Sequence, residues 1–179
     1  VALDAALAGL DLIFKAQIPA EEVAAIIVEP VQGEGGVIPA PDEWLRSVRE
    51  MTTRQQIPLI LDEVQTGWGR TGKLYAFEHA GIVPDVLVLS KAIGGGLPLA
   101  VIVFREELNV WQPGAHTGTF RGNQLAMAAG LATLRFLRDH DLPAQAEARG
   151  EQFQMRLQKL QAAHPFLGEV RGRGLMLGV

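Results

Sequence analysis

The chain has 179 residues, which is enough for one hydrophobic core of ordinary size and part of a second domain. Hydrophobic residues make up 48% and charged residues 20%, a composition typical of a soluble globular chain. The net charge of −4 argues against nucleic acid or an anionic membrane as the main partner. Its longest apolar runs, such as residues 97–104, are too short to span a bilayer, and the absence of cysteine is compatible with a cytoplasmic protein.

The first half of the chain alternates helical patterns with short β-branched runs. Helices are indicated by apolar residues at a spacing of three to four, and buried strands by short apolar runs that end at polar residues or proline. In chain order these patterns predict a helix over 4–15, a strand over 24–30, a glycine-rich loop over 32–36, a helix over 41–56 and a strand over 58–64.

The second half continues the alternation. It predicts a loop over 67–72, a strand over 85–90, a fourth strand over 97–104, a loop over 116–123, a helix over 124–140 capped by Asn123, a helix over 142–164 and a strand after Pro165. Strand and helix in alternation indicate an α/β fold with a mostly parallel sheet covered on both faces. The connection around 140–143 is the candidate domain boundary.

Polar residues stand where three of these strands end. The first strand ends at Glu29, the second at Asp62 and the third at Lys91. In open α/β sheets, ligands bind beyond the carboxyl ends of the strands, so we expect all three at one edge of the sheet.

Each of these residues has a structural alternative. An isolated Asp62 most simply caps a backbone amide, whereas a functional Asp62 needs a cation such as a pyridinium nitrogen. A lone strand-end lysine is usually solvated, but the apolar strand before Lys91 and the glycines after it favour a desolvated amine that attacks an aldehyde. His79 and His116 lack acids or cysteines at metal-ligand spacing, so we expect no metal site.

Four motifs in order resemble class III pyridoxal-phosphate (PLP) aminotransferases. They are VEPVQGEGG (28–36), LILDEVQTGWGRTG (59–72), LSKAIGGGLPLAVIV (89–103) and HTGTFRGNQLAMAAG (116–130). The resemblance implies the PLP-dependent transferase fold of type I, with 1–140 as the later part of the large PLP-binding domain and 141–179 as the beginning of the small C-terminal domain. We therefore expect a piece of a longer protein.

The resemblance also implies roles for individual residues. Lys91 resembles the lysine that forms a Schiff base with PLP and shuttles a proton, and Asp62 resembles the partner of the ring nitrogen. Val64 resembles the side chain packed on one ring face, and Gln65 the residue that reaches the phenolic oxygen. Thr119 resembles a phosphate ligand supplied across a homodimer interface.

Two acids complete the expected site. Glu29 resembles a site acid near Gln65. Glu34 resembles a switch carboxylate that pairs with a substrate-binding arginine; its alternative is an exposed loop glutamate. In this family the other phosphate-binding amides precede the matching segment and that arginine follows it, so the chain alone is expected to bind PLP weakly or not at all.

The loop TFRGNQLA departs from the commoner family pattern. Arg121 and Gln124 stand where most relatives have a small residue and a proline. This form resembles the diaminobutyrate–2-oxoglutarate branch, which implies ping-pong transfer of an amino group from 2,4-diaminobutyrate to 2-oxoglutarate. Ornithine, acetylornithine and 4-aminobutyrate enzymes, a PLP-dependent aminomutase and a non-catalytic fragment remain as alternatives, and Arg121 could equally anchor its loop or pair across the dimer.

Overall fold

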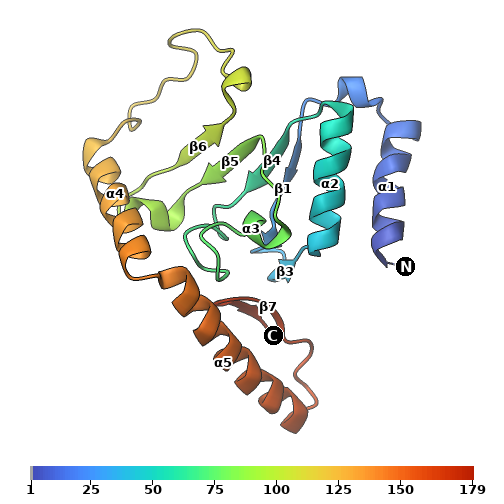
Figure 1. Ribbon diagram of the computed structural model, residues 1–179, viewed down its shortest axis with the longest axis vertical. Coiled ribbons are helices and arrows are strands. Elements are labelled where there is room, and N and C mark those ends of the chain that lie inside the picture. Colours follow the sequence, from blue (N-terminus) through green and yellow to red (C-terminus); the bar gives the residue numbers. More distant parts are fainter. Residues whose placement is uncertain (1) are drawn as a thin grey trace.

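A four-stranded sheet lies at the centre of the computed structural model, which describes residues 2–179 (Figure 1). Its strands run in the order β1 (Ile26–Val28), β4 (Leu59–Asp62), β5 (Val86–Leu89) and β6 (Val101–Phe104). The first three are mutually parallel, and β6 is antiparallel to β5. The predicted α/β fold with a mostly parallel sheet is confirmed.

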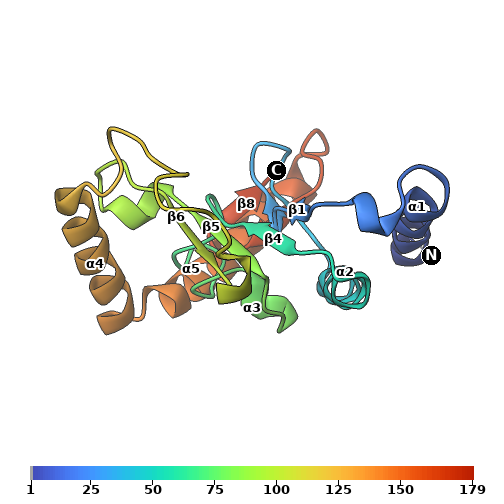
Figure 2. The ribbon, with the colours of Figure 1, turned by 90° about the horizontal axis from the view of Figure 1, so that it is seen from above.

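The longer helices lie around this sheet. They are α1 (Ala2–Ala16), α2 (Asp42–Gln55), α4 (Gln124–Asp139) and α5 (Leu142–Ala163). Seen from above, α2 lies between α1 and the sheet, while α4 lies at the opposite end, beyond β6 (Figure 2). No helix within residues 2–179 combines the length and apolar character needed to cross a membrane.

Helix α2 shows how the sequence builds the core. Pro41 precedes it, acidic residues fill its first turn, and Gln56 ends it in a left-handed conformation with φ 58°. Its apolar face packs against the two buried leucines of β4, because residues three to four apart share one side of a helix. These core residues are Leu45, Val48, Met51, Leu59 and Leu61.

Several short elements lie outside the sequence predictions. They are η1 (Ala20–Glu22), β2 (Val31–Gln32), β3 (Ile38–Pro39), α3 (Phe77–Ala80), η2 (Lys91–Gly94) and η3 (Glu106–Leu108). The segment 32–36, predicted as loop, contains the end of β2 and the turn that pairs it with β3. The strand predicted from residue 97 begins only at Val101, because the Leu97 N–H closes a turn onto the Gly94 carbonyl oxygen at 3.0 Å.

A C-terminal hairpin closes over the turn between β2 and β3. It consists of β7 (Arg171–Arg173) and β8 (Met176–Gly178), and β7 lies against both α5 and β3. The Arg171 guanidinium donates two hydrogen bonds to the Gly36 carbonyl oxygen, at 2.8 and 2.6 Å. The Leu175 N–H donates to the Arg70 carbonyl oxygen at 2.9 Å. The hairpin is thus bonded to both glycine-rich loops.

Candidate active site

Asp62 and Lys91 lie at the ends of neighbouring parallel strands. Asp62 is the last residue of β4 and pairs in register with Val88 of β5. The next residue, Glu63, donates its N–H to the Val88 carbonyl oxygen at 2.9 Å. Lys91 begins η2, two residues after the end of β5. The expectation that both residues lie at one edge of the sheet is therefore met.

Asp62 has one engaged and one available carboxylate oxygen. Its Oδ1 accepts a hydrogen bond from the Val64 N–H at 3.0 Å. Its Oδ2 accepts none from any residue in 2–179, and the side chain is half-buried. Capping of a backbone amide thus uses only one oxygen, and the other is free to accept a hydrogen bond from a cationic N–H donor.

Lys91 differs from expectation in its burial. It is exposed and adopts φ 53°, which costs an L-residue about 1–2 kcal/mol. The expectation of a desolvated amine is wrong for the described residues: α4 packs against η2, but Lys91 itself stays exposed. The preceding Ser90 hydroxyl donates to the Leu99 carbonyl oxygen at 2.9 Å and holds the turn in this conformation.

The loop after β4 is held by a buried acid that the sequence analysis did not assign. The Glu63 side chain is fully buried and accepts hydrogen bonds from the Thr66 hydroxyl and from the N–H groups of Ala76 and Phe77, at 2.8, 2.7 and 2.9 Å. Burial raises the pKa of Glu63, and these hydrogen bonds partly oppose the rise. In the sequence, the only sign of this role is that Glu63 is the second of two acids that follow the apolar run LIL.

Gln65, Glu34 and Glu29 are brought to one place. The Gln65 Nε2 donates to Glu34 Oε1 at 3.1 Å, and the Gly33 N–H donates to Glu29 Oε2 at 2.9 Å. A Cβ at Gly33 would lie 2.9 Å from the Gln65 Cγ, so the loop between β2 and β3 packs directly on Gln65. Arg70, which the sequence analysis did not single out, donates to the Gln65 carbonyl oxygen at 3.1 Å.

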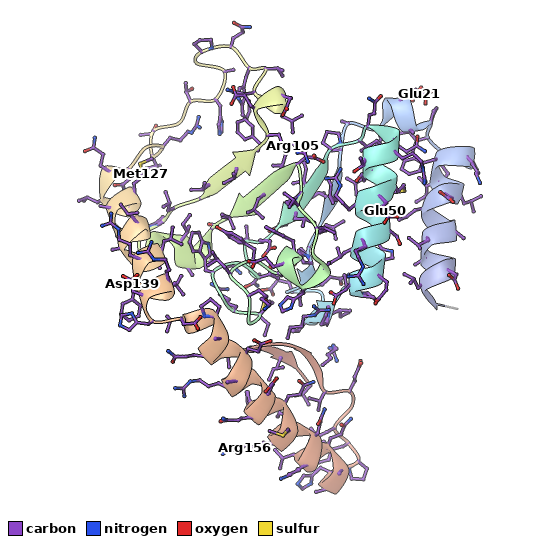
Figure 3. All side chains as sticks on the ribbon, in the orientation of Figure 1. Glu21, Glu50, Arg105, Met127, Asp139 and Arg156 are labelled. Carbon is purple, nitrogen blue, oxygen red and sulfur yellow. The ribbon has the colours of Figure 1, made fainter. Side chains whose placement is uncertain are left out.

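Thr119 is not brought to these residues. The segment 109–123 between η3 and α4 is a long loop that projects away from the sheet (Figure 3), and all of its residues are exposed. Thr119 and Arg121 are exposed, and the neighbouring Phe120 is 91% exposed. Within the described residues, no hydrogen bond joins Thr119 to the sheet edge that carries Asp62 and Lys91.

These groups fit the donors and acceptors of PLP. An accessible amine at Lys91 can react with an aldehyde, the free oxygen of Asp62 can accept from a protonated ring nitrogen, and the Gln65 amide can donate to a phenolic oxygen. An α/β sheet with a lysine and an aspartate at the carboxyl ends of adjacent strands is the arrangement expected of a PLP-dependent transferase. More particularly, the sequence model "Aminotransferase class-III" matches residues 5–179, so the chain belongs to the class III aminotransferases.

Individual relatives agree with this family. The chain is 63% identical over 156 residues to a diaminobutyrate–2-oxoglutarate aminotransferase of Rhizobium meliloti, covering 87% of this chain and 33% of that enzyme. It therefore spans about a third of the length of the curated relative.

Solved structures agree as well. An (S)-enantioselective ω-transaminase from Thermomicrobium roseum matches with a TM-score of 0.91 and 34% identity, over 98% of this chain and 40% of that one. An ornithine aminotransferase from Toxoplasma gondii, described with PLP in partial occupancy at its active site, matches with a TM-score of 0.83 and 41% identity, over 87% of this chain and 38% of that one.

Proposed function

We propose that the protein containing this chain transfers the ω-amino group of a diamino acid to 2-oxoglutarate, with PLP held on Lys91. The observation that carries the proposal is the placement of Lys91 and the free Asp62 oxygen at the ends of adjacent parallel strands. When bound, PLP supplies an electron-withdrawing ring that stabilises negative charge on the substrate carbon.

Each residue of the sheet edge has a distinct task in this proposal. The Lys91 amine would hold PLP through its aldehyde, and once the amino donor had taken its place, the Lys91 Nζ would take up and return the substrate proton. Asp62 Oδ2 would keep the ring nitrogen protonated through a charge-assisted hydrogen bond. Val64 would lie against one ring face, and the Gln65 Nε2 would donate to the phenolic oxygen.

The two acids of the neighbouring loop shape the donor side of the site. Glu29 holds the loop through the Gly33 N–H. Glu34 is exposed and bonded only to Gln65 among the described residues, so it can exchange that contact for a substrate-binding arginine outside this chain. Such an exchange would let one site accept a basic donor and then a dicarboxylate acceptor.

The leading donor in the proposal is 2,4-diaminobutyrate. Two observations support it: the TFRGNQLA form of the loop with Arg121 and Gln124, and the 63% identity to a relative named for this substrate pair. Ornithine, acetylornithine and 4-aminobutyrate are the alternative donors. A PLP-dependent aminomutase is the alternative reaction, since it would need the same lysine and aspartate.

The organisation of the whole protein is also part of the proposal. We place residues 1–140 in the large PLP-binding domain and 141–179 at the start of the small domain, and Asp141, with φ 46°, separates α4 from α5 at that point. We also propose a homodimer in which Thr119 reaches the phosphate bound by the partner subunit. The exposure of the whole segment 111–123 supports this arrangement.

Covalent trapping tests the central proposal. The full-length protein is incubated with PLP, reduced with borohydride and digested, and the modified peptide is mapped by mass spectrometry. We expect the label on Lys91 and no label in Lys91→Ala, with Lys73 as the lysine that stays unmodified in both. A label on another lysine, or no label in the wild type, would contradict the proposal.

Product analysis separates the reactions. With 2,4-diaminobutyrate and 2-oxoglutarate, a transaminase forms one glutamate for each donor consumed. Consumption of the donor without glutamate would favour the aminomutase, and faster turnover with ornithine or 4-aminobutyrate would reassign the donor.

A further inference from the structure

Arg70 makes two contacts with one residue of the candidate site. Its Nη1 donates to the backbone carbonyl oxygen of Gln65 at 3.1 Å and to the Gln65 side-chain Oε1 at 3.4 Å. Both contacts are partly buried, so water competes with them less than it would at an open surface.

These contacts decide which end of the Gln65 amide faces outward. A guanidinium group has only donors, so the amide must turn its oxygen toward Arg70 and its NH₂ group away from it. The Nε2 then donates to Glu34 Oε1 at 3.1 Å, and its second N–H is left for another acceptor. A flipped amide would place two donors together at Arg70 and two acceptors together at Glu34.

Arg70 is itself fixed from the C-terminal side. Its carbonyl oxygen accepts the Leu175 N–H at 2.9 Å from the turn between β7 and β8. Its loop also contains Trp68, which is 6% exposed and packs edge-on against Tyr75 with the ring centroids 6.1 Å apart. Gln65 is therefore supported by its own loop and by the hairpin of β7 and β8, which comes about a hundred residues later in the chain.

We propose that Arg70 is a positioning residue that locks the Gln65 amide with its Nε2 toward Glu34 and the phenolic oxygen of PLP. The inference rests on the proposed function, since it assigns Arg70 to the same site. It links the contact with the cofactor to the Glu34 switch through a single amide: Arg70 sets the orientation, Gln65 donates, and Glu34 accepts.

The spectrum of bound PLP measures this orientation. A donor at the phenolic oxygen favours its anionic form, so losing the donor moves the pH midpoint of the visible absorption change upward. In the full-length protein we expect Arg70→Met to raise this midpoint by about 0.5–1 pH unit and to weaken PLP binding about fivefold, as for one lost hydrogen bond. Circular dichroism checks folding, and the backbone bond to Leu175 is unaffected by the substitution.

Two variants separate positioning from simple loss of charge. Arg173→Met removes an equal charge from β7, where Arg173 pairs with Asp42 at 2.8 Å and does not contact Gln65, so it should leave the midpoint unchanged. In a Gln65→Ala background, Arg70→Met should have no further effect on the midpoint. Arg70→Lys keeps a positive charge and a side chain that can only donate hydrogen bonds. It should therefore give a midpoint between those of the wild type and Arg70→Met.

The outcomes distinguish the two proposals. A wild type that fixes PLP on Lys91, combined with an unchanged midpoint in Arg70→Met or a shift that persists in the Gln65→Ala background, would overturn the role of Arg70 alone. A wild type that binds no PLP would overturn the proposed function and this inference together.

Discussion

Two carboxylates that are adjacent in the sequence meet opposite environments. Asp62 is half-buried with one oxygen free, whereas Glu63 is fully buried with three donors directed at it. Side chains alternate across an extended segment, so consecutive residues at the end of β4 point to opposite sides. One acid thereby keeps a free oxygen at the sheet edge, and the other fastens the loop that carries Val64 and Gln65.

The environment of Glu63 predicts a specific pH dependence. Burial raises its pKa above the ordinary value of 4.5, so the folded chain holds this proton more tightly than the unfolded chain does. Its contribution to stability is therefore fully present below pH 4.5 and is lost as the pH rises through the raised pKa.

Glu63→Gln should remove this contribution, because glutamine does not titrate. Urea unfolding from pH 4.5 to 8 should show the variant gaining free energy of unfolding relative to the wild type as the pH rises. Glu50→Gln is the control, since Glu50 is an exposed acid of α2 and is not among the groups that shift the Glu63 pKa. Parallel pH profiles for the wild type and Glu63→Gln would show that this carboxyl is not responsible.

At the scale of elements, the turn that carries Lys91 depends on its fit against α4. Gly130 of α4 is buried, and a Cβ there would lie 2.6 Å from the Ile93 carbonyl oxygen and 3.1 Å from the Leu99 side chain. The pattern of α4 predicted the helix and its Asn123 cap, whose Oδ1 accepts the Leu125 N–H at 3.1 Å. It did not show why a glycine stands in the middle of that helix.

Gly130→Ala should destabilise the protein although alanine is the better helix former. The clash with backbone should cost about 1–3 kcal/mol and displace the Lys91 turn, outweighing the ~1 kcal/mol gain in helix propensity. Gly9→Ala in α1 is the control: its Cβ would meet nothing within 4 Å, so it should stabilise by about 0.5–1 kcal/mol. Urea unfolding measures both, and a stabilised Gly130→Ala would disprove the close fit.

At the scale of the whole molecule, the chain exposes apolar side chains in groups. On β6 and α4 these include Ile102, Val103, Leu125, Met127 and Leu131. The segment between these two elements adds Val110 at 81% and Phe120 at 91% exposure. Large exposed apolar side chains on consecutive segments of the chain are typical of surfaces that another subunit covers, which agrees with the proposed dimer contact around Thr119.

Mixed dimers test whether Thr119 acts across that contact. If it does, a dimer of one Lys91→Ala and one Thr119→Ala subunit contains one site with both native residues. Mixing the inactive Lys91→Ala homodimer with the impaired Thr119→Ala homodimer under subunit exchange should then raise the activity above that of both parents, up to half of the wild-type activity per mixed dimer. If Thr119 served its own subunit, no mixed dimer would hold an intact site and activity would stay at the level of the parents.

The amino-acid sequence was enough to predict the longer elements and to suggest which residues of the sheet edge carry the chemistry. Apolar periodicity located α1, α2, α4 and α5 and four strands of the central sheet, because burial depends on spacing along one chain. Four ordered motifs indicated the class III family, which the match over residues 5–179 confirms. The roles of Asp62, Lys91 and their neighbours remain predictions that the proposed experiments test.

The contacts around the candidate site could be seen only in the folded chain. Arg70 meets Gln65, Arg171 holds the Gly36 carbonyl oxygen, and Glu63 receives the amides of Ala76 and Phe77. It also left Lys91 exposed where the sequence predicted burial. The reason is physical: hydropathy patterns report how buried a residue is on average, whereas a hydrogen-bond partner or a covered edge depends on segments that meet only after folding.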